Sequence, residues 1–425
     1  MRVLFAAYAE KTHFFPMVPI AWALRVAGHD VRVATQRPLV DTVLQTGLPV
    51  AEVAPGHDWQ SVVADRVRRG DWDEWVQRVT DVARGGHRMG WDDLHAYFDE
   101  QVEHAWKWFN RGMVDGLVGH VRDWRPDLVL WEPFTFSAAL AARVAGVPHA
   151  RVTWGVDVWV RARRRFVELL AARPPGRRTD PFRDWLGAEA ERFGSSFDEE
   201  LFTGQWTIDQ SPGSMRLPLD VPTVPVRYIP YNGPGEIPDW LREPPRRPRV
   251  CVTAGLTQRG LLGTELLGPS TLEALAGLDV EVIATLQGGD EAADPPENVR
   301  LVDFVPMDAL LPTCSAVVHM GGFGVSSTAM RHGVPQLTIP KLGDSTVRAD
   351  LLRDTGAGLA VPLDDATPEA VRDAVARLLD EPRFGAAAER LRRETLADPA
   401  PGDAVGTLER LAAGAPTAPA GPTRA

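Results

Sequence analysis

Short apolar runs alternate with segments of helical periodicity at the start of the chain. The runs Val3–Ala7 and Val31–Ala34 flank Met17–Ala27, in which apolar residues recur at helical spacing. This strand–helix–strand order predicts a βαβ unit, the building block of a parallel sheet. The same order resumes further on with a strand, a helix and a closing strand, at Asp127–Trp131, Phe134–Ala145 and His149–Val152.

A second series of the same kind begins at Arg249. Apolar strand-like runs and helical segments alternate again, so we expect a second parallel sheet and an α/β fold with two Rossmann-like halves. The predicted elements are a strand and turn at 249–257, strands at Val280–Leu286, Val299–Val302, Ala316–Val318 and Gln336–Ile339, and helices at Thr271–Leu278, Val325–His332, Pro368–Leu379 and Ala386–Thr395.

The segments between these series suggest where the domains divide. Trp59–Asp123 is charged, helical in pattern and rich in tryptophan, and these rings either belong to the core, line an apolar pocket or face a partner. Residues 155–215 are expected to be helical and irregular. The predicted division is an amino-terminal domain at 1–217, a Pro/Gly-rich linker at 218–248, a carboxyl-terminal domain at 249–396, and a last helix with a disordered tail at 397–425.

Composition excludes several classes of partner. With 425 residues, 44% hydrophobic and 24% charged, the chain suits a globular protein of two domains. Its net charge of -11 argues against nucleic acid, since phosphate backbones need clustered cations. No apolar stretch has the length that spans a bilayer, and the first apolar run is too short for a signal peptide. Cys251 and Cys314 lie in or beside apolar runs, so we expect both to be buried, reduced thiols. Reduced cysteines fit a cytoplasmic protein.

A glycine-rich turn joins a strand to a helix between residues 316 and 332. The apolar run ends in His319, and Gly321, Gly322 and Gly324 follow before the helix. Unpaired N–H groups and the positive end of the helix dipole would meet in this turn, which suits an anion such as a diphosphate. Alternatively, the glycines only allow the helix to pack closely on the strand.

His13 and Glu132 are the candidates for acid–base chemistry. Each follows a predicted strand, and ligands of open α/β sheets gather at the carboxyl ends of the strands. An imidazole can accept a proton near neutral pH, and a carboxylate beside it would orient the ring. The competing interpretation of His13 is a solvated or helix-capping loop residue.

The glycine turn resembles the donor-binding motif of GT-B glycosyltransferases that attach deoxysugars to polyketides. His319, Gly321, Gly322 and Gly324 match a segment that grips a nucleotide diphosphate, whereas Met320 and Val325 depart from it. In place of Val325 the family has a hydroxyl residue, so only a backbone contact is expected there. The resemblance covers nearly the whole chain, including LVLWEPFTF and YNGP, and is closest to macrolide and anthracycline aminosugar transferases. It implies two Rossmann-like domains that face each other across a cleft.

The same resemblance assigns further donor-binding residues. It places Gly255 and Thr257 at the diphosphate, Phe304 and the Val305 backbone at the nucleobase, and Asp344 at the sugar hydroxyls. The full set of expected donor-binding residues is Gly255, Thr257, Phe304, Val305, His319, Gly321, Gly322, Gly324, Val325, Asp344 and Ser345. On residue type alone, Phe304 also fits the core and Asp344 also fits a helix cap. Lys341 and Gly343 differ from the family pattern, so the resemblance does not identify the sugar.

The resemblance implies an inverting transfer from a thymidine diphosphate deoxysugar to a hydroxyl of a polyketide aglycone. His13 would act as base with Glu132 as its partner, and neither a catalytic metal nor another cofactor is expected. Many members of the family need a helper protein, a cytochrome-like fold without haem, for which Trp59–Asp123 is the expected docking region. A homodimer is also compatible with the resemblance.

Two other functions fit parts of the sequence. A GT-B nucleotide-sugar epimerase would have the same halves without an aglycone, and the tryptophan-rich insertion argues against it. A transferase homologue that lost catalysis and became a helper or binding protein is kept open by Met320, Val325 and the altered 341–343 segment.

Overall fold

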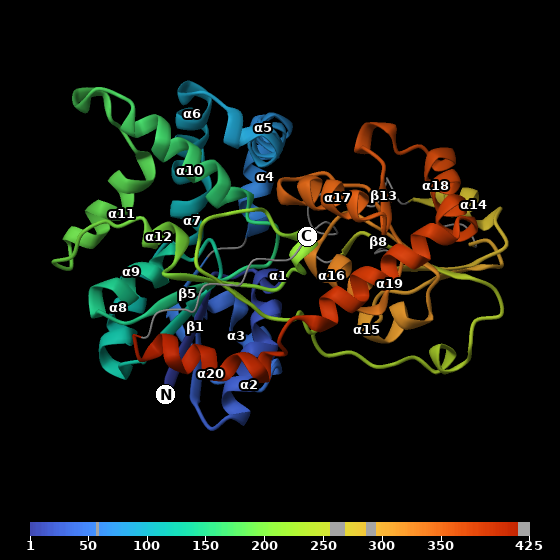
Figure 1. The fold of residues 1–425 in the computed structure, drawn as a ribbon, viewed down its shortest axis with the longest axis horizontal. Helices are drawn as coiled ribbons and strands as arrows, with labels where there is room; N and C mark the ends of the chain where they lie inside the picture. The colour runs from blue at the N-terminus through green and yellow to red at the C-terminus, as the bar shows by residue number, and fades with distance from the viewer. Residues whose placement is uncertain (57–58, 256–267, 286–294, 415–425) are drawn as a thin grey trace. The chain divides into compact units, whose positions relative to one another are not determined.

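The computed structural model describes residues 1–56, 59–255, 268–285 and 295–414. It divides into two compact units, each built on one parallel sheet (Figure 1). Unit 1 contains residues 1–210, 217–226 and 399–425, and unit 2 contains 211–216 and 227–398. The prediction of two parallel α/β halves is therefore confirmed.

The sheet of unit 1 has seven strands in the order β3-β2-β1-β4-β5-β6-β7. The strands are β1 (Arg2–Ala7), β2 (Asp30–Gln36), β3 (Val50–Ala54), β4 (Leu128–Trp131), β5 (His149–Val152), β6 (Trp206–Asp209) and β7 (Thr223–Pro225). The strand order reverses at β1, which pairs with β2 on one side and β4 on the other. Such a switch point is where open α/β sheets bind ligands.

The insertion between β3 and β4 is helical, as predicted. It consists of α4 (Trp59–Arg69), α5 (Trp72–Gly85), α6 (Trp91–Gln101), the π-helix η4 (Val102–Trp106), α7 (Lys107–Phe109) and α8 (Met113–Trp124). Trp72, Trp75 and Trp106 are buried, so for these three rings the core interpretation is correct.

The middle of the chain supplies two strands that the sequence did not predict. Residues 155–215 are mostly helical and irregular, as expected, with α10 (Val158–Ala171), α11 (Pro181–Glu191) and α12 (Glu200–Thr203), and they also supply β6 to the sheet. The stretch expected as a linker likewise supplies β7, which pairs with β6. Both strands are short and stand among loops and helices, so neither shows a clear period along the sequence.

The sheet of unit 2 has six strands in the order β10-β9-β8-β11-β12-β13. They are β8 (Arg249–Thr253), β9 (Glu281–Thr285), β10 (Val299–Leu301), β11 (Ala316–His319), β12 (Gln336–Thr338) and β13 (Gly358–Ala360). The main helices are α14 (Pro269–Ala276), α16 (Phe323–His332), α17 (Asp344–Thr355), α18 (Pro368–Asp380) and α19 (Pro382–Ala397). Two apolar clusters cover the sheet, one of which includes Val252, Val318 and Met320 and the other Cys251, Val317 and Ala329.

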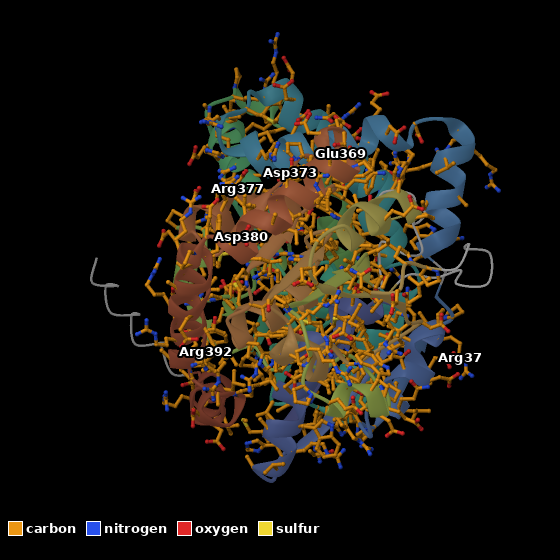
Figure 2. All side chains as sticks on the ribbon, turned by 90° about the vertical axis from the view of Figure 1, so that its right-hand side faces the viewer. Arg37, Glu369, Asp373, Arg377, Asp380 and Arg392 are labelled. Atoms are coloured by element: carbon orange, nitrogen blue, oxygen red, sulfur yellow. The ribbon has the colours of Figure 1, made fainter. Side chains whose placement is uncertain are left out.

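Helix α18 shows why these segments are helical and where they pack. Val371, Ala374, Val375 and Leu378 are buried, while Glu369, Asp373 and Arg377 recur every fourth residue on the exposed face. Figure 2 labels charged side chains of this face. This separation is typical of a helix that covers one side of a sheet.

The last helix, α20 (Pro401–Ala412), belongs to unit 1 and packs on α2 (Val18–Val26). Leu408 and Leu411 are its buried residues nearest the end of the described chain. The imidazole of His29 lies 3.1 Å from Glu409 and adds a polar contact between this helix and the amino-terminal part of unit 1.

Candidate functional site

His13 and Glu132 lie together at the switch point of the unit 1 sheet. His13 is in α1 (Lys11–Phe14), which follows β1 and begins where the Glu10 carboxylate accepts a hydrogen bond from the Thr12 N–H. Glu132 comes directly after β4, and its N–H donates to the carbonyl of Ala6. Because β1 and β4 are adjacent, the two side chains meet, with His13 Nδ1 at 3.1 Å from Glu132 Oε2. The structure thus brings together the pair expected from the sequence.

The Glu132 carboxylate is fully buried and surrounded by hydrogen-bond donors. Besides His13, its Oε2 accepts from the Trp154 indole N–H and the Phe134 backbone N–H, each at 3.1 Å. Its Oε1 accepts from the Thr135 hydroxyl. An ionised carboxylate accepts from all of these groups, and they compensate for its lost hydration. The His13 ring then carries its proton on Nδ1 and leaves Nε2 as the acceptor of a new proton.

Aromatic side chains surround His13. The indole of Trp154 stacks on the imidazole with ring centroids 3.8 Å apart, and Tyr8 meets it edge-on at 5.3 Å. Burial raises the pKa of Tyr8 well above its ordinary value of 10.0, and Glu10 and Glu132 raise it further, so this phenol stays neutral. Sequence reasoning missed Tyr8, Thr135 and Trp154. Only the position of Tyr8 at the end of the first strand could have indicated it.

The glycine turn of unit 2 presents an open helix N-terminus. Gly321 has a φ of +80°, and a Cβ on it would lie 2.9 Å from the Cβ of Ser345, so a side chain does not fit. Gly322 is the N-cap of α16, and within the described ranges no side chain caps this helix. A Cβ on Gly322 would meet no heavy atom of the described residues within 4 Å. The first N–H groups of α16 are thus without a side-chain cap, and the turn has room beside Gly322, two features that suit an anion site.

His319 is buried in the floor of this turn. Its Nδ1 accepts from the Gly321 N–H at 3.0 Å, which leaves the proton on Nε2, and Nε2 lies 2.9 Å from Gln336 Oε1. Burial lowers its pKa to about 4; the bond to Gln336 opposes this shift, and Arg348 adds to it. The ring is thus neutral and bonded on both nitrogens inside the protein. A direct bond to phosphate, as the resemblance implied, would require it to give up one of these partners.

The two departures from the family motif point into the core. Met320 is buried in the apolar cluster with Val252 and Val318, and Val325 packs against the cluster on the other side of the sheet. Neither side chain is free to provide a polar contact to phosphate. An anion in this turn would depend on backbone N–H groups, which both residues retain.

Arg348 connects the glycine turn to the next helix. Its buried guanidinium donates to the Gly321 carbonyl and to the carboxylate of Asp344, the first residue of α17. It also lies over the Phe323 ring, 5.5 Å from the centroid. The Ser345 hydroxyl, by contrast, turns back and donates to the Leu342 carbonyl at 2.7 Å. Sequence reasoning missed Arg348 and Gln336, although Asp344 and Arg348 have the spacing of a helical ion pair.

Three further expected donor residues, Gly255, Phe304 and Val305, follow the carboxyl ends of strands β8 and β10 of the unit 2 sheet. Gly255 follows β8 with a φ of +75°, and its N–H donates to the Thr253 hydroxyl. Thr257 lies outside the described residues. Phe304 is 40% exposed rather than part of the core, and Gly235 packs against its ring, whereas the Val305 side chain is buried.

Within the described ranges, no group of three or more His, Cys, Asp or Glu side chains could hold a metal ion. No helix in the described part of the chain is long and apolar enough to cross a membrane.

Two family models match the chain in succession. The amino-terminal domain of erythromycin biosynthesis protein CIII-like proteins matches residues 22–255, and the carboxyl-terminal domain of the same family matches residues 269–411. The chain is 45% identical to 10-deoxymethynolide desosaminyltransferase of Streptomyces venezuelae, over 97% of both chains. It is 43% identical to aklavinone 7-beta-L-rhodosaminyltransferase of Streptomyces galilaeus, over 97% of this chain and 96% of that one.

Solved structures show the same architecture. The glycosyltransferase VinC in complex with DTDP is 38% identical, with a TM-score of 0.86 over 97% of this chain and 100% of VinC. The spinosyn forosaminyltransferase SpnP is 40% identical, with a TM-score of 0.80 over 97% of this chain and 99% of SpnP. The expected GT-B fold is therefore confirmed.

Proposed function

We propose that this chain, which belongs to the erythromycin biosynthesis protein CIII-like family of glycosyltransferases, transfers a deoxysugar from a thymidine diphosphate donor to a hydroxyl of a polyketide aglycone. The relatives that support this substrate class are named for sugars such as desosamine and rhodosamine and for acceptors such as 10-deoxymethynolide and aklavinone. VinC, which has the same fold, holds DTDP.

The donor diphosphate would bind at the N-terminus of α16. The N–H groups after Gly322, which no described side chain caps, and the helix dipole favour an anionic leaving group, and the space beside Gly322 leaves room for it. Phe304 has the exposed ring surface on which a nucleobase can stack. Asp344 would accept hydrogen bonds from sugar hydroxyls, while Arg348 holds its carboxylate.

The acceptor hydroxyl would bind at His13. Nε2 takes the hydroxyl proton, the acceptor oxygen forms a bond to the anomeric carbon, and the bond from that carbon to the diphosphate breaks. Thymidine diphosphate leaves with the bonding electrons, and the helix N-terminus stabilises its charge. The configuration at the anomeric carbon inverts in a single displacement. This scheme uses no metal.

The His13–Glu132 pair is the observation that carries the proposal. A binding protein without catalysis has no need of a buried carboxylate that orients an imidazole, whereas a transferase needs a base for the acceptor proton. The proposed roles of Gly255, Thr257 and Ser345 follow the family resemblance alone.

The test is incubation of the purified chain with thymidine diphosphate sugars and polyketide aglycones, read by mass spectrometry. A product heavier than the aglycone by one deoxysugar supports the proposal. Isomerised sugar in the absence of aglycone would instead indicate an epimerase. Failure to bind thymidine diphosphate in a calorimetric titration would indicate a helper protein.

We also propose three features of the cellular setting. A haem-less, cytochrome-like helper protein would dock on the helical insertion, and full turnover by the chain alone would contradict this. The chain would act in the cytoplasm, where Cys251 and Cys314, which are free thiols, stay reduced. A homodimer would show in the mass measured by light scattering.

A further inference from the structure

We infer that Trp154 is a positioning residue for the base His13, an inference that rests on the proposed transferase function. Trp154 contacts both members of the pair. Its ring stacks on the imidazole at 3.8 Å with an angle of 23° between the planes, and its Nε1–H donates to Glu132 Oε2 at 3.1 Å. The same Oε2 accepts from His13 Nδ1, so one carboxylate oxygen ties the indole and the imidazole together.

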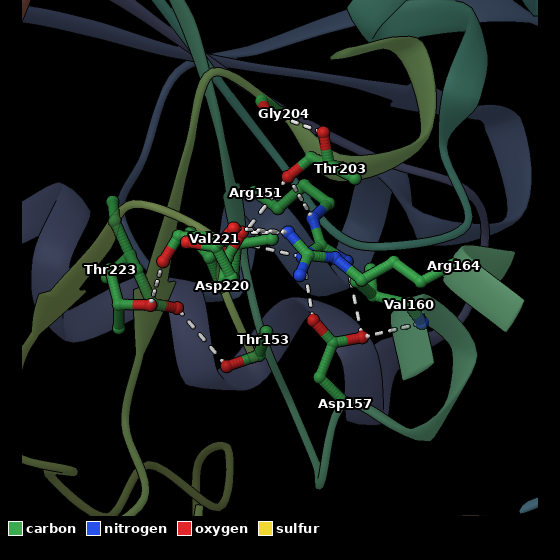
Figure 3. Close-up of polar contacts among 12 residues, drawn as sticks. Arg151, Thr153, Asp157, Val160, Arg164, Thr203, Gly204, Asp220, Val221 and Thr223 are labelled. Carbon is green, nitrogen blue, oxygen red and sulfur yellow. Dashed lines mark hydrogen bonds and ion pairs between the residues drawn. The ribbon is translucent and has the colours of Figure 1, made fainter. Parts of the chain in front are cut away.

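The segment that carries Trp154 is fixed on both sides. Before it, the Thr153 N–H donates to the Ile208 carbonyl of β6 at 3.0 Å. After it, Asp157 accepts from the Val160 N–H and so caps α10, and it pairs with the buried guanidinium of Arg151 at 2.7 Å. Figure 3 shows Arg151 and Asp157 pointing toward one another. A loop anchored in this way holds the indole against His13 without further help.

Arg151 joins this loop to the neighbouring strand as well. Its guanidinium donates to the hydroxyl of Thr207 in β6 at 2.8 Å. It also donates to the carbonyl of Thr203, the last residue of α12, at 2.6 Å (Figure 3). A buried arginine with several partners is costly to displace, because its charge would remain without compensation. The position of Trp154 is therefore set by the sheet rather than by the ligand.

This geometry has two consequences for the base. The indole covers one face of the imidazole and restricts its rotation, so Nε2 stays directed away from Glu132 toward the acceptor. When Nε2 takes the proton, the positive ring lies against an aromatic face, which stabilises the charge. Both effects act on the proton-transfer step, so removing them should lower kcat rather than weaken donor binding.

The test compares Trp154→Phe with Trp159→Phe as a matched control. Trp159 stacks on Phe134 and is not among the groups that donate to Glu132. Trp154→Phe keeps a ring and loses the N–H; loss of one hydrogen bond to a charged group predicts a kcat about tenfold lower. Trp154→Leu, which loses the stack as well, should reduce kcat further. Neither change should alter the Kd for thymidine diphosphate, and Trp159→Phe should keep kcat within about twofold of wild type.

An unchanged kcat in Trp154→Phe, with only KM for the aglycone raised, would overturn the inference and leave Trp154 as a pocket wall.

A second measurement on the intact protein does not depend on turnover. The Trp154 indole N–H proton should resonate downfield in the wild type and move upfield in Glu132→Gln. If it does not move, the inference fails even where transfer is observed. If the wild type transfers no sugar, the proposed function fails, and this resonance still tests the contact.

Discussion

His13 and His319 are the same side chain in opposite surroundings. His13 keeps one ring nitrogen bonded to a carboxylate and the other available. His319 uses both nitrogens inside the protein, and burial lowers its pKa to about 4. The first arrangement suits proton transfer, and the second suits a rigid floor beneath the glycine turn.

Replacing His13 tests its role as base. His13→Ala should lower kcat by about 10² to 10⁴, the usual contribution of general base catalysis, and leave the Kd for thymidine diphosphate unchanged. Steady-state kinetics and calorimetry measure these quantities. His95→Ala, a half-buried histidine of the same unit whose Nε2 lies 2.9 Å from the Thr179 hydroxyl, is the matched control. Near-normal turnover in His13→Ala would remove the assignment.

Replacing Arg348 tests how the turn is held. Arg348→Met keeps most of the buried stem but loses the bonds to Gly321 and Asp344, so we expect the free energy of unfolding to fall by about 3 kcal/mol. The Kd for thymidine diphosphate should rise about tenfold, because the carbonyl of Gly321 is released and the turn loosens. Arg353→Met, on the exposed side of the same helix, should change neither quantity. Equal behaviour of both variants would show that Arg348 does not support the turn.

At the scale of elements, the segment made of β11, its glycine turn and α16 can be interpreted as an anion site or as a packing motif. Gly321 is required for packing, since a Cβ on it would collide with Ser345. Gly322 has a φ of -62° and open space in front of it, so the fold does not require glycine there. If the turn served packing alone, a methyl group on Gly322 would change neither the free energy of unfolding nor the binding of thymidine diphosphate.

Gly322→Ala therefore separates the two interpretations. We expect an unchanged free energy of unfolding, within about 0.5 kcal/mol, and thymidine diphosphate binding weakened about tenfold or more, because the methyl group occupies the space of the phosphate. Denaturant titration and calorimetry give the two values. Gly321→Ala should lower stability as well as binding. Normal binding by Gly322→Ala would favour close packing as the reason for the glycines.

Buried histidines in both units make the stability of the whole molecule depend on pH. His149 on β5 accepts from the Trp131 indole, and burial lowers its pKa to about 4, as for His319 in unit 2. Both folded-state values lie below the ordinary value of 6.5, so the unfolded chain binds more protons between pH 6.5 and 4. Stability that is fully present above pH 6.5 is lost as pH falls through this window.

The expected loss is at most about 1.4 kcal/mol per pH unit for each histidine. Denaturant titrations at pH 7 and pH 5 measure it. His149→Gln keeps an acceptor for the Trp131 N–H. In this variant, the free energy of unfolding of unit 1 should fall less between pH 7 and pH 5 than in the wild type. If the free energy of unfolding changes with pH equally in the wild type and the variant, His149 does not contribute to the pH dependence.

The molecule also shows which features a sequence can predict. Long apolar runs such as Val3–Ala7 and the glycine turn are local, and both were located correctly. Strands β3, β6, β7 and β13 were missed. The last three have only three or four residues, and β7 ends in a proline within a Pro-rich stretch. β3 (VAEVA) is longer, but it has a glutamate at its centre and is mostly half-buried, so it lacks a continuous apolar run.

Long-range contacts explain two of the missed site residues. Trp154 reaches Glu132 across 22 positions, and Gln336 reaches His319 across 17. Such pairings depend on which strands become neighbours in the sheet, and residue spacing does not reveal this. The pair of His13 and Glu132 could be predicted because both follow strands at one sheet edge and because the chain resembles the GT-B family.

The return of α20 to unit 1 has a consequence for building chimeras with relatives. Because residues 399–414 fold with the amino-terminal half, one crossover point cannot exchange the donor half intact. A cassette with two junctions, near 226 and 398, would exchange all of unit 2 except residues 211–216 and would leave Leu408 and Leu411 in contact with their own unit. Under the proposed function, such a chimera would change the sugar preference and leave the proposed acceptor-binding half unchanged.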